Sequence, residues 1–404
     1  MNVLIITDSF YPDGYGGIHT YVYNLCKNLV QKGNIVTVIC PNFDSRLKEK
    51  EYIDGIKIFR YKSISTGKLL LLRRPLYALR AYFNFKDYVK KSKFDVINFH
   101  SCLSAFGYSL FLRKFSGARI FTFHASISRE VEAQSHVKEY SKFIPLKIIL
   151  KILRKIESYN LKNTDKIITL SEFNKKELLK DFQKIENSKV AVIPGGVDTN
   201  IFRPCENKKL IRRRLGIPED KFIFFTIRRL VARMGLENLI NAFREINIKH
   251  PNTILIIGGD GFLRDKLVTL AQERNILNKI VFTGKISMEY LPLYYQASDL
   301  FILPTKQLEG FGLVILEALS SGLPVLSTPV GGAKEIIDKL GDGCLFKSSS
   351  SSDIVKGVNN YLDYHGACKR VMPIECRNFA LCHYSWPQIT EEISMLYKCL
   401  TNTR

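Results

Sequence analysis

The chain has 404 residues, of which 46% are hydrophobic and 24% are charged, and its formal net charge at pH 7 is +22. This length is too great for one typical core, so we expect two domains, and the composition excludes a disordered protein. The nine cysteines include no Cys-x-x-Cys pair, so they predict neither a disulfide framework nor a zinc site. Because we also expect no signal peptide and no membrane-spanning run, the predicted location is the cytoplasm.

The first half of the chain alternates short apolar runs with helical patterns. An amphipathic helix is predicted over residues 20–32, ending at Gly33. Strands are predicted at 3–7, 35–40, 94–99, 119–123, 166–170 and 189–193. This alternation indicates an α/β domain with a mostly parallel sheet.

The same alternation begins again in the second half. Strands are predicted at 222–227, 254–257, 280–283, 300–303 and 325–327, with helices at 236–249 and 264–274. A proline followed by two glycines, at 194–196, marks the break between the halves. We therefore expect a first domain over 1–194, a second over 195–380, and a C-terminal helix within 381–404.

Positive charge is concentrated in the first 195 residues, which carry +16, against +6 for the remainder. A basic surface attracts nucleic acid, anionic lipid or anionic substrates. We expect no nucleic acid partner, because the chain has no recognised nucleic-acid-binding motif. Two basic, apolar segments, 68–93 and 143–155, have the pattern of helices that lie on a membrane surface. The pattern fits equally well with helices that bury an apolar face in the core, and both interpretations stay open.

The most informative segment is 309–322, which reads EGFGLVILEALSSG. Because predicted strands flank it, it belongs to a parallel strand, turn, helix, strand unit. Gly310 and Gly312 allow the backbone to approach a ligand closely, and the N–H groups at the helix start can point at its oxygens. Glu309 and Glu317 can accept hydrogen bonds from different hydroxyls of one extended ligand, such as a sugar nucleotide.

This segment resembles the E-x7-E motif of the retaining nucleotide-sugar glycosyltransferases of family 4. The resemblance implies a GT-B fold, in which two Rossmann-like α/β domains face each other across a cleft and the last helix returns towards the N-terminal, acceptor-side domain. It implies that Glu317 binds the donor ribose. It also implies that the donor sugar is held by Glu309, Gly310, Phe311, Gly312 and Leu313.

A glycine-rich turn after the first predicted strand extends the resemblance. Gly16 and Gly17 lie in this turn, which opens the first helix. Backbone N–H groups exposed in such a turn can bind an anionic oxygen. The two glycines match the family's loop that faces the donor phosphates, so we predict that they bind the donor.

Three arginines surround the end of the strand at 222–227. Arg228, Arg229 and Arg233 can hold a diphosphate through charge-assisted hydrogen bonds of fixed geometry. Arg229 matches the family pattern, whereas Arg228 stands in place of a glycine and Met234 in place of a lysine. A methionine cannot stabilise a leaving diphosphate. Another cation must therefore do so, and Arg228 and Arg233 are the nearest candidates.

Two histidines follow predicted strands of the first half, at the strand ends where parallel sheets bind ligands. His124 matches the family's histidine near the anomeric carbon of the donor sugar, so we predict a catalytic role for it beside Arg229 and Glu309. His100 is the weaker candidate of the two. In the second half, Ile286 matches the family's contact with the nucleobase. The chain has no Asp-x-Asp pair in a suitable strand context, no zinc-ligand spacing and no P-loop, so we expect no metal and no cofactor.

The resemblance therefore predicts a retaining, metal-independent hexosyltransferase that moves a sugar from a nucleotide-diphosphate donor to a hydroxyl acceptor. We expect it to act in the synthesis of cell-surface polysaccharide, lipopolysaccharide or glycolipid. The basic segments favour a lipid-linked or polysaccharide acceptor and a peripheral contact with the anionic inner face of the cell membrane. Two alternatives remain: a GT-B sugar-nucleotide epimerase or hydrolase, and a non-catalytic sugar-nucleotide-binding protein.

Overall fold

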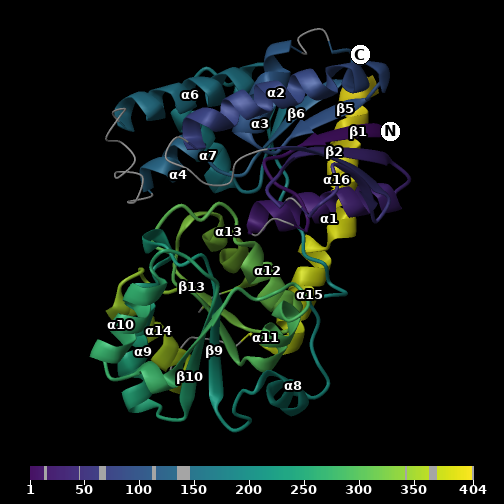
Figure 1. The fold of residues 1–404 in the computed structure, drawn as a ribbon. Helices are drawn as coiled ribbons and strands as arrows, with labels where there is room; N and C mark the ends of the chain where they lie inside the picture. Colours follow the sequence, from purple (N-terminus) through teal and green to yellow (C-terminus); the bar gives the residue numbers. More distant parts are fainter. Residues whose placement is uncertain are drawn as a thin grey trace. The chain divides into compact units, whose positions relative to one another are not determined.

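The structure is a computed structural model that describes residues 1–12, 16–44, 46–62, 70–111, 115–133, 146–341, 344–363 and 371–402. The chain forms two compact α/β units (Figure 1). The first comprises Met1–Gly195 together with Trp386–Arg404, and the second comprises Gly196–Ser385. Within the segment 381–404, α15 (Pro373–Tyr384) ends in the second unit, and α16 (Trp386–Asn402) belongs to the first.

The first unit contains an eight-stranded sheet with the order β3-β4-β2-β1-β5-β6-β7-β8. Its neighbouring strands pair in parallel except for β3 and β4. The strands are β1 (Asn2–Ile6), β2 (Ile35–Asn42), β3 (Lys50–Ile53), β4 (Ile56–Lys62), β5 (Val96–Phe99), β6 (Ala118–Phe123), β7 (Lys166–Thr169) and β8 (Val190–Val192). The six predicted strands are confirmed, whereas the β3–β4 hairpin was not predicted.

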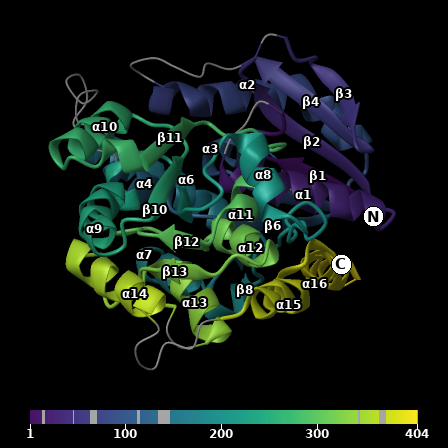
Figure 2. The same ribbon diagram turned by 90° about the horizontal axis from the view of Figure 1, so that it is seen from below.

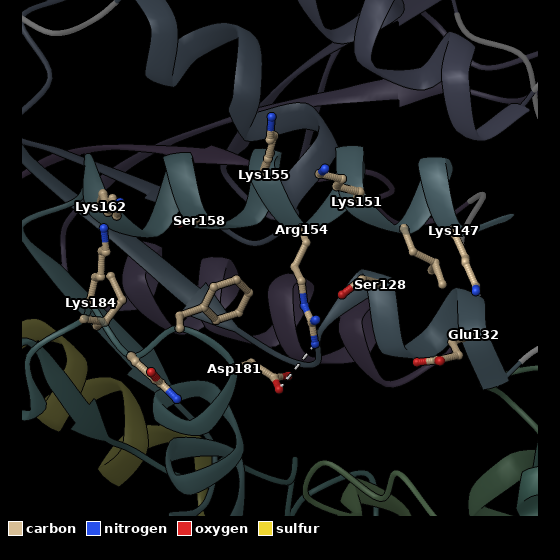
Figure 3. A pocket seen from close by; sticks show the side chains of 14 residues that line it. Ser128, Glu132, Lys147, Lys151, Arg154, Lys155, Ser158, Lys162, Asp181 and Lys184 are labelled. Atoms are coloured by element: carbon tan, nitrogen blue, oxygen red, sulfur yellow. Dashed lines mark ion pairs between the residues drawn. The ribbon is translucent and has the colours of Figure 1, made fainter. Parts of the chain in front are cut away.

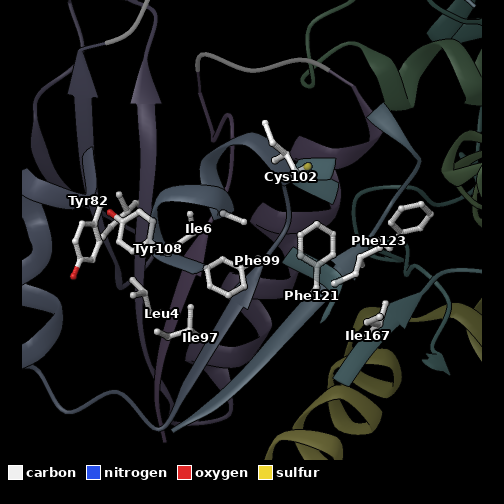
Figure 4. Packing of buried hydrophobic residues seen from close by; sticks show 14 of the residues in the cluster. Leu4, Ile6, Tyr82, Ile97, Phe99, Cys102, Tyr108, Phe121, Phe123 and Ile167 are labelled. Atoms are coloured by element: carbon white, nitrogen blue, oxygen red, sulfur yellow. The ribbon is translucent and has the colours of Figure 1, made fainter. Parts of the chain in front are cut away.

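Helices cover both faces of this sheet. On one face α1 (Gly17–Gln31) packs against α16. On the other, α2 (Leu70–Lys91) packs against α3 (Cys102–Phe111), α3 against α6 (Leu146–Lys162), and α6 against α4 (Ile127–Ala133). Figure 4 shows part of the core of this unit, in which alternate residues of four strands belong to one cluster with Tyr82 of α2 and Tyr108 of α3. These strand residues are Leu4, Ile6, Ile97, Phe99, Phe121, Phe123 and Ile167. Continuous burial of this kind is typical of a parallel sheet between two helical layers.

The second unit contains a five-stranded parallel sheet with the order β11-β10-β9-β12-β13. Its strands are β9 (Phe222–Ile227), β10 (Thr253–Gly258), β11 (Ile280–Gly284), β12 (Leu300–Leu303) and β13 (Val325–Ser327). Figure 2 shows α9 (Leu236–Lys249), α10 (Arg264–Glu273) and α14 (Ser351–Asp363) on one side of the sheet. The other side carries α8 (Lys208–Leu215), α11 (Leu291–Ala297), α12 (Leu313–Ser320) and α15.

The two basic, apolar segments both contain helices. Within 68–93 the structure has α2. In the second segment α6 begins at Leu146 and continues to Lys162, whereas residues 63–69 and 134–145 lie outside the described part of the chain. On α6 one face is buried through Ile149, Leu153 and Ile156, while Ile148 and Ile152 are 50% and 41% exposed. Across the described residues, no helix is long and apolar enough to span a bilayer.

Candidate active site

The carboxyl ends of β9 and β12 bring two predicted segments together. These strands are neighbours in the second sheet and pair in parallel. Arg228 follows β9 directly, and Thr305 and Glu309 lie between β12 and α12. Open α/β sheets bind their ligands at this edge. The two segments therefore meet where a ligand site is expected.

The Arg228 guanidinium lies at the centre of this group. Its Nη2 donates to Thr305 Oγ1 at 2.9 Å, lies 3.1 Å from Met234 Sδ, and forms an ion pair with Glu309. Thr305 Oγ1 in turn donates to Glu309 Oε2 at 3.1 Å. The side chains of Arg228 and Glu309 are only 7% and 10% exposed. Charges buried to this extent need a partner, and here each charge neutralises the other.

The backbone of Glu309 is fixed by its neighbours. The amide of Gly332, in α13 (Gly331–Leu340), donates to the Glu309 carbonyl at 2.9 Å. A Cβ at Gly331, where φ is +63°, would lie 1.9 Å from the same oxygen, so only glycine permits this approach. On the other side, Arg233 Nη1 donates to the Leu308 carbonyl at 2.8 Å. Arg233, a predicted donor-binding residue, thus holds the loop that carries Glu309.

The glycine-rich turn leads directly into α12. Gly312 precedes the helix with φ +97°, Leu313 is its first residue, and no side chain caps it. The N-terminal N–H groups of such a helix and its dipole favour ligand oxygens. Phe311 is 6% exposed and its ring lies 6.1 Å from the ring of Tyr384, so its side chain belongs to the packing of the second unit. Gly310 is half-buried at the start of this turn.

Glu317 lies in the second turn of α12 and is 7% exposed. The hydroxyl of Tyr295, in α11, donates to Glu317 Oε2 at 2.7 Å. Burial raises the pKa of Glu317 to about 7, and the hydrogen bond from Tyr295 opposes that rise. The carboxyl is therefore poised to gain or lose a proton near neutral pH.

The loops after β10 and β11 lie beside Arg228. The amide of Arg228 donates to the Gly258 carbonyl at 3.0 Å, and a Cβ at Gly259 would lie 1.9 Å from the Arg228 carbonyl. A Cβ at Gly258 would lie 2.8 Å from Ile286 Cδ1, which places the predicted nucleobase contact in the same group of loops. Arg229 is exposed at this edge, and its carbonyl accepts from the amide of Val231 at 2.9 Å.

In the first unit, the two predicted histidines meet. They follow the neighbouring strands β5 and β6, and His100 Nδ1 lies 3.2 Å from His124 Nε2. Burial lowers the pKa of both rings, that of His124 to about 3, so both are neutral at pH 7. The Tyr21 ring packs edge-on against His124 at 5.0 Å. Two neutral rings in contact can share one hydrogen bond but cannot both donate to each other.

The two predicted glycines of the first unit lie at the start of α1. Gly17 is the first residue of the helix, and Gly16 precedes it with φ +109°. No side chain caps α1, so its first turn has the same character as that of α12. Residues 13–15 of the predicted turn lie outside the described residues.

Comparison with known proteins agrees with this geometry. Residues 15–201 match the sequence model of Glycosyltransferase Family 4, and residues 207–372 match that of Glycosyl transferases group 1. The chain belongs to the family 4 glycosyltransferases.

Relatives of this glycosyltransferase extend over the whole chain. An uncharacterized glycosyltransferase of Methanocaldococcus jannaschii is 29% identical over 98% of both chains. A GDP-mannose-dependent alpha-(1-6)-phosphatidylinositol monomannoside mannosyltransferase of Mycolicibacterium smegmatis is 26% identical over 95% of both. Among solved structures, sucrose-phosphate synthase from Thermosynechococcus elongatus superposes with a TM-score of 0.83 at 22% identity, covering 100% of both chains. The fold of this glycosyltransferase is GT-B, as predicted.

Three residues of this glycosyltransferase were not predicted from the sequence. Thr305 links Arg228 to Glu309, and Tyr295 holds Glu317. Glu157, on α6, is buried and accepts hydrogen bonds from Ile127 N at 2.7 Å, Ser128 Oγ at 2.9 Å and Ser126 Oγ at 3.2 Å. It thereby fixes the loop that follows His124. A single threonine, tyrosine or glutamate carries no local pattern, so only the tertiary contacts distinguish these three.

A basic groove runs along α6 in the first unit of the glycosyltransferase (Figure 3). It has a volume of about 610 Å³, and Lys162 and Lys184 lie at one end and Lys147 at the other, with Arg154 pointing towards Asp181 between them. Leu150, Phe182 and Ile185 give it apolar walls; its further lining residues are Ser128, Glu132, Lys151, Lys155, Ser158 and Gln183.

Within the described residues, no group of three or more histidines, cysteines and acidic residues is arranged to hold a metal ion.

Proposed function

We propose that this enzyme transfers a sugar, with retained anomeric configuration and without a metal ion, from a nucleoside-diphosphate sugar to a hydroxyl acceptor. The observation that carries the proposal is the buried group of Arg228, Glu309 and Thr305 beside the uncapped start of α12. It puts positive charge, a carboxylate and backbone N–H groups at one sheet edge. These are the groups that a diphosphate and a sugar hydroxyl require.

Each group has a proposed role in the reaction. Arg229 and Arg228 stabilise the leaving diphosphate. The Glu309 carboxylate and the backbone of 310–313 accept and donate hydrogen bonds to the sugar, and Glu317 accepts from the ribose hydroxyls. Fixed charges aimed at a developing anion commonly contribute more to catalysis than any other single effect. The Arg228–Glu309 pair means that Glu309 is held as a ligand-orienting carboxylate, which argues against its use as a nucleophile.

In the proposed chemistry, the bond between the anomeric carbon and the phosphate oxygen breaks while the acceptor oxygen bonds to the same face of that carbon. The acceptor's proton passes to the departing phosphate oxygen, so no metal and no further co-reactant enter the balance. We propose that Gly16 and Gly17 bind the donor and that His124 acts near the anomeric carbon, where its neutral ring can donate or accept a hydrogen bond.

The proposed acceptor is a lipid-linked or polysaccharide hydroxyl at an anionic membrane surface. The mycobacterial relative is named for action on a phosphatidylinositol monomannoside, which supports an acceptor of this class. On α6, the exposed side chains of Ile148 and Ile152 lie among Lys147, Lys151 and Lys155. A helix of this composition binds anionic bilayers through combined apolar burial and charge attraction.

The function is tested by a thermal-shift screen of UDP-, GDP- and ADP-sugars, with and without EDTA, followed by transfer assays with the sugar that binds. A ligand that binds the folded state raises the melting temperature by mass action. We expect one nucleotide sugar to stabilise the protein equally well in EDTA and to give a transferred, retained product by NMR. Release of free sugar or of an epimer, with no acceptor product, would show a hydrolase or an epimerase instead. Binding without any turnover would show a non-catalytic binder.

The membrane contact is tested by co-sedimentation with vesicles of phosphatidylglycerol and phosphatidylcholine. We expect binding at low salt that weakens as salt screens the charges. The variant Lys151→Glu/Lys155→Glu should lose it, whereas Lys339→Glu/Lys356→Glu, the same charge change on the second unit, should keep it. Equal binding of the two variants contradicts the assignment to α6.

A further inference from the structure

We infer that Arg228 supplies a buried positive charge that meets the donor's phosphates beside the exposed Arg229, and that the uncharged side chain of Met234 leaves the space for it. The inference rests on the proposed donor site and assigns the phosphate contact within it. It also predicts that positions 228 and 234 are coupled: a cation at either one serves the site, and cations at both interfere.

Arg228 has donors left over. Its Nη2 is engaged with Glu309, Thr305 and Met234, whereas its buried Nε has no hydrogen-bond partner within the described chain. The side chain is more than nine-tenths buried. Buried donors in proteins are almost always hydrogen-bonded, so the unpaired Nε–H group points to an acceptor that arrives with the ligand. At this sheet edge, the acceptor that fits a guanidinium is a phosphate oxygen.

Met234 determines whether Arg228 can occupy this position. Its side chain is 5% exposed, packs in the core with Leu230 and Leu236, and ends 3.1 Å from Arg228 Nη2. A lysine side chain is two atoms longer beyond the position of the sulfur, so its ammonium would reach the space that the guanidinium fills. Two cations at such a distance repel strongly in a buried site, and one carboxylate, Glu309, would have to neutralise both.

The neighbouring arginines are placed differently. Arg233 Nη1 donates to the Leu308 carbonyl at 2.8 Å, so it supports the loop before Glu309. Arg229 is exposed at this edge of the sheet. Arg228 combines a buried guanidinium, contact with Glu309 and Thr305, and an Nε that has no partner among the described residues.

The test is a four-way comparison of wild type, Arg228→Ala, Met234→Lys and the double variant, by calorimetric binding of UDP and GDP and by transfer rate. One charge-assisted contact corresponds to a loss of about 10- to 100-fold in affinity, which we expect for Arg228→Ala. We expect Met234→Lys to lose affinity too. The double variant should recover to within about 10-fold of wild type. Arg274→Ala, an exposed arginine of the same unit, should bind as wild type does.

Two results overturn the inference: Arg228→Ala binding as tightly as wild type, or a double variant that binds no more tightly than the single variants. Thermal unfolding of each variant separates lost binding from lost structure, and recovery in the double variant cannot arise from misfolding. If wild type itself binds neither nucleotide nor any nucleotide sugar, it is the proposed function that fails. If wild type binds and the double variant does not recover, only the assignment to Arg228 fails.

Discussion

Replacing Glu317 by glutamine should change how the stability of the second unit depends on pH. Glu317 is 7% exposed, and burial raises its pKa from 4.5 to about 7. The folded protein therefore keeps a proton that the unfolded chain releases between these two pH values. The contribution of this group to stability is complete below pH 4.5 and is lost as pH rises through 7. A rise of this size corresponds to about 3 kcal/mol of unfolding free energy.

The glutamine side chain of Glu317→Gln keeps the shape of the glutamate and its contact with Tyr295, but it cannot ionise. We expect wild type to lose about 3 kcal/mol relative to this variant between pH 4.5 and 8. Tyr295→Phe should raise the pKa of Glu317 further, because it removes the hydrogen bond that favours the ionised carboxylate. Its Glu317 should take up a proton at a higher pH than wild type.

Urea unfolding monitored by circular dichroism at five pH values measures this difference. Trp386, the single tryptophan, lies in the first unit against Tyr21, so its fluorescence follows the other unit in the same samples. We expect that fluorescence transition to be the same in wild type and Glu317→Gln. If the dichroism midpoints of the two proteins run parallel from pH 4.5 to 8, Glu317 does not titrate as described and the reasoning is refuted.

Three further results are expected. Gly331→Ala should destabilise the protein by about 2–5 kcal/mol, because its Cβ would clash with the Glu309 carbonyl and its backbone would be strained in the left-handed region. Gly216→Ala has the same backbone strain but open space around the Cβ, so it should cost about 1–2 kcal/mol. Equal urea midpoints for the two variants would contradict the clash. Arg229→Ala should lower kcat by about 100-fold, and an unchanged kcat in the transfer assay would remove it from the proposed catalytic group. The first unit should lose less unfolding free energy in His124→Gln than in wild type as pH falls from 6.5 towards 3, since burial holds the pKa of His124 at about 3 in the folded protein. Trp386 fluorescence during acid unfolding measures this loss. An acid-unfolding profile identical to that of wild type would contradict it.

Much of the fold is predictable from the sequence because its strands are continuous apolar runs. β9, β12 and β13 begin and end at the predicted residues, since polar residues, prolines or glycines bound each run. The β3–β4 hairpin was not predicted because β3 has only four residues, Lys-Glu-Tyr-Ile, and none of them is fully buried, so it forms no apolar run. Its turn, Asp54-Gly55 with positive φ at both residues, is a dipeptide typical of hairpins and was the available signal.

The site is less predictable, because its contacts join residues far apart in the chain. The glycine and glutamate spacing at 309–317 indicated the turn and the helix, both of which are present. The sequence could not distinguish Arg228 from Arg233, because which side chain turns inward depends on Thr305, 77 residues after Arg228. The contact between His100 and His124 likewise depends on β5 and β6 being neighbours in the sheet, which is a property of the topology.

The most direct measurement is a crystal structure of the protein with a non-hydrolysable analogue of the nucleotide sugar that gives the largest thermal shift. We predict diphosphate oxygens within hydrogen-bond distance of the Arg228 and Arg229 guanidinium groups, a sugar hydroxyl on Glu309 and a ribose hydroxyl on Glu317. A bound analogue whose diphosphate lies away from both arginines, with Glu309 still paired to Arg228 alone, would contradict it.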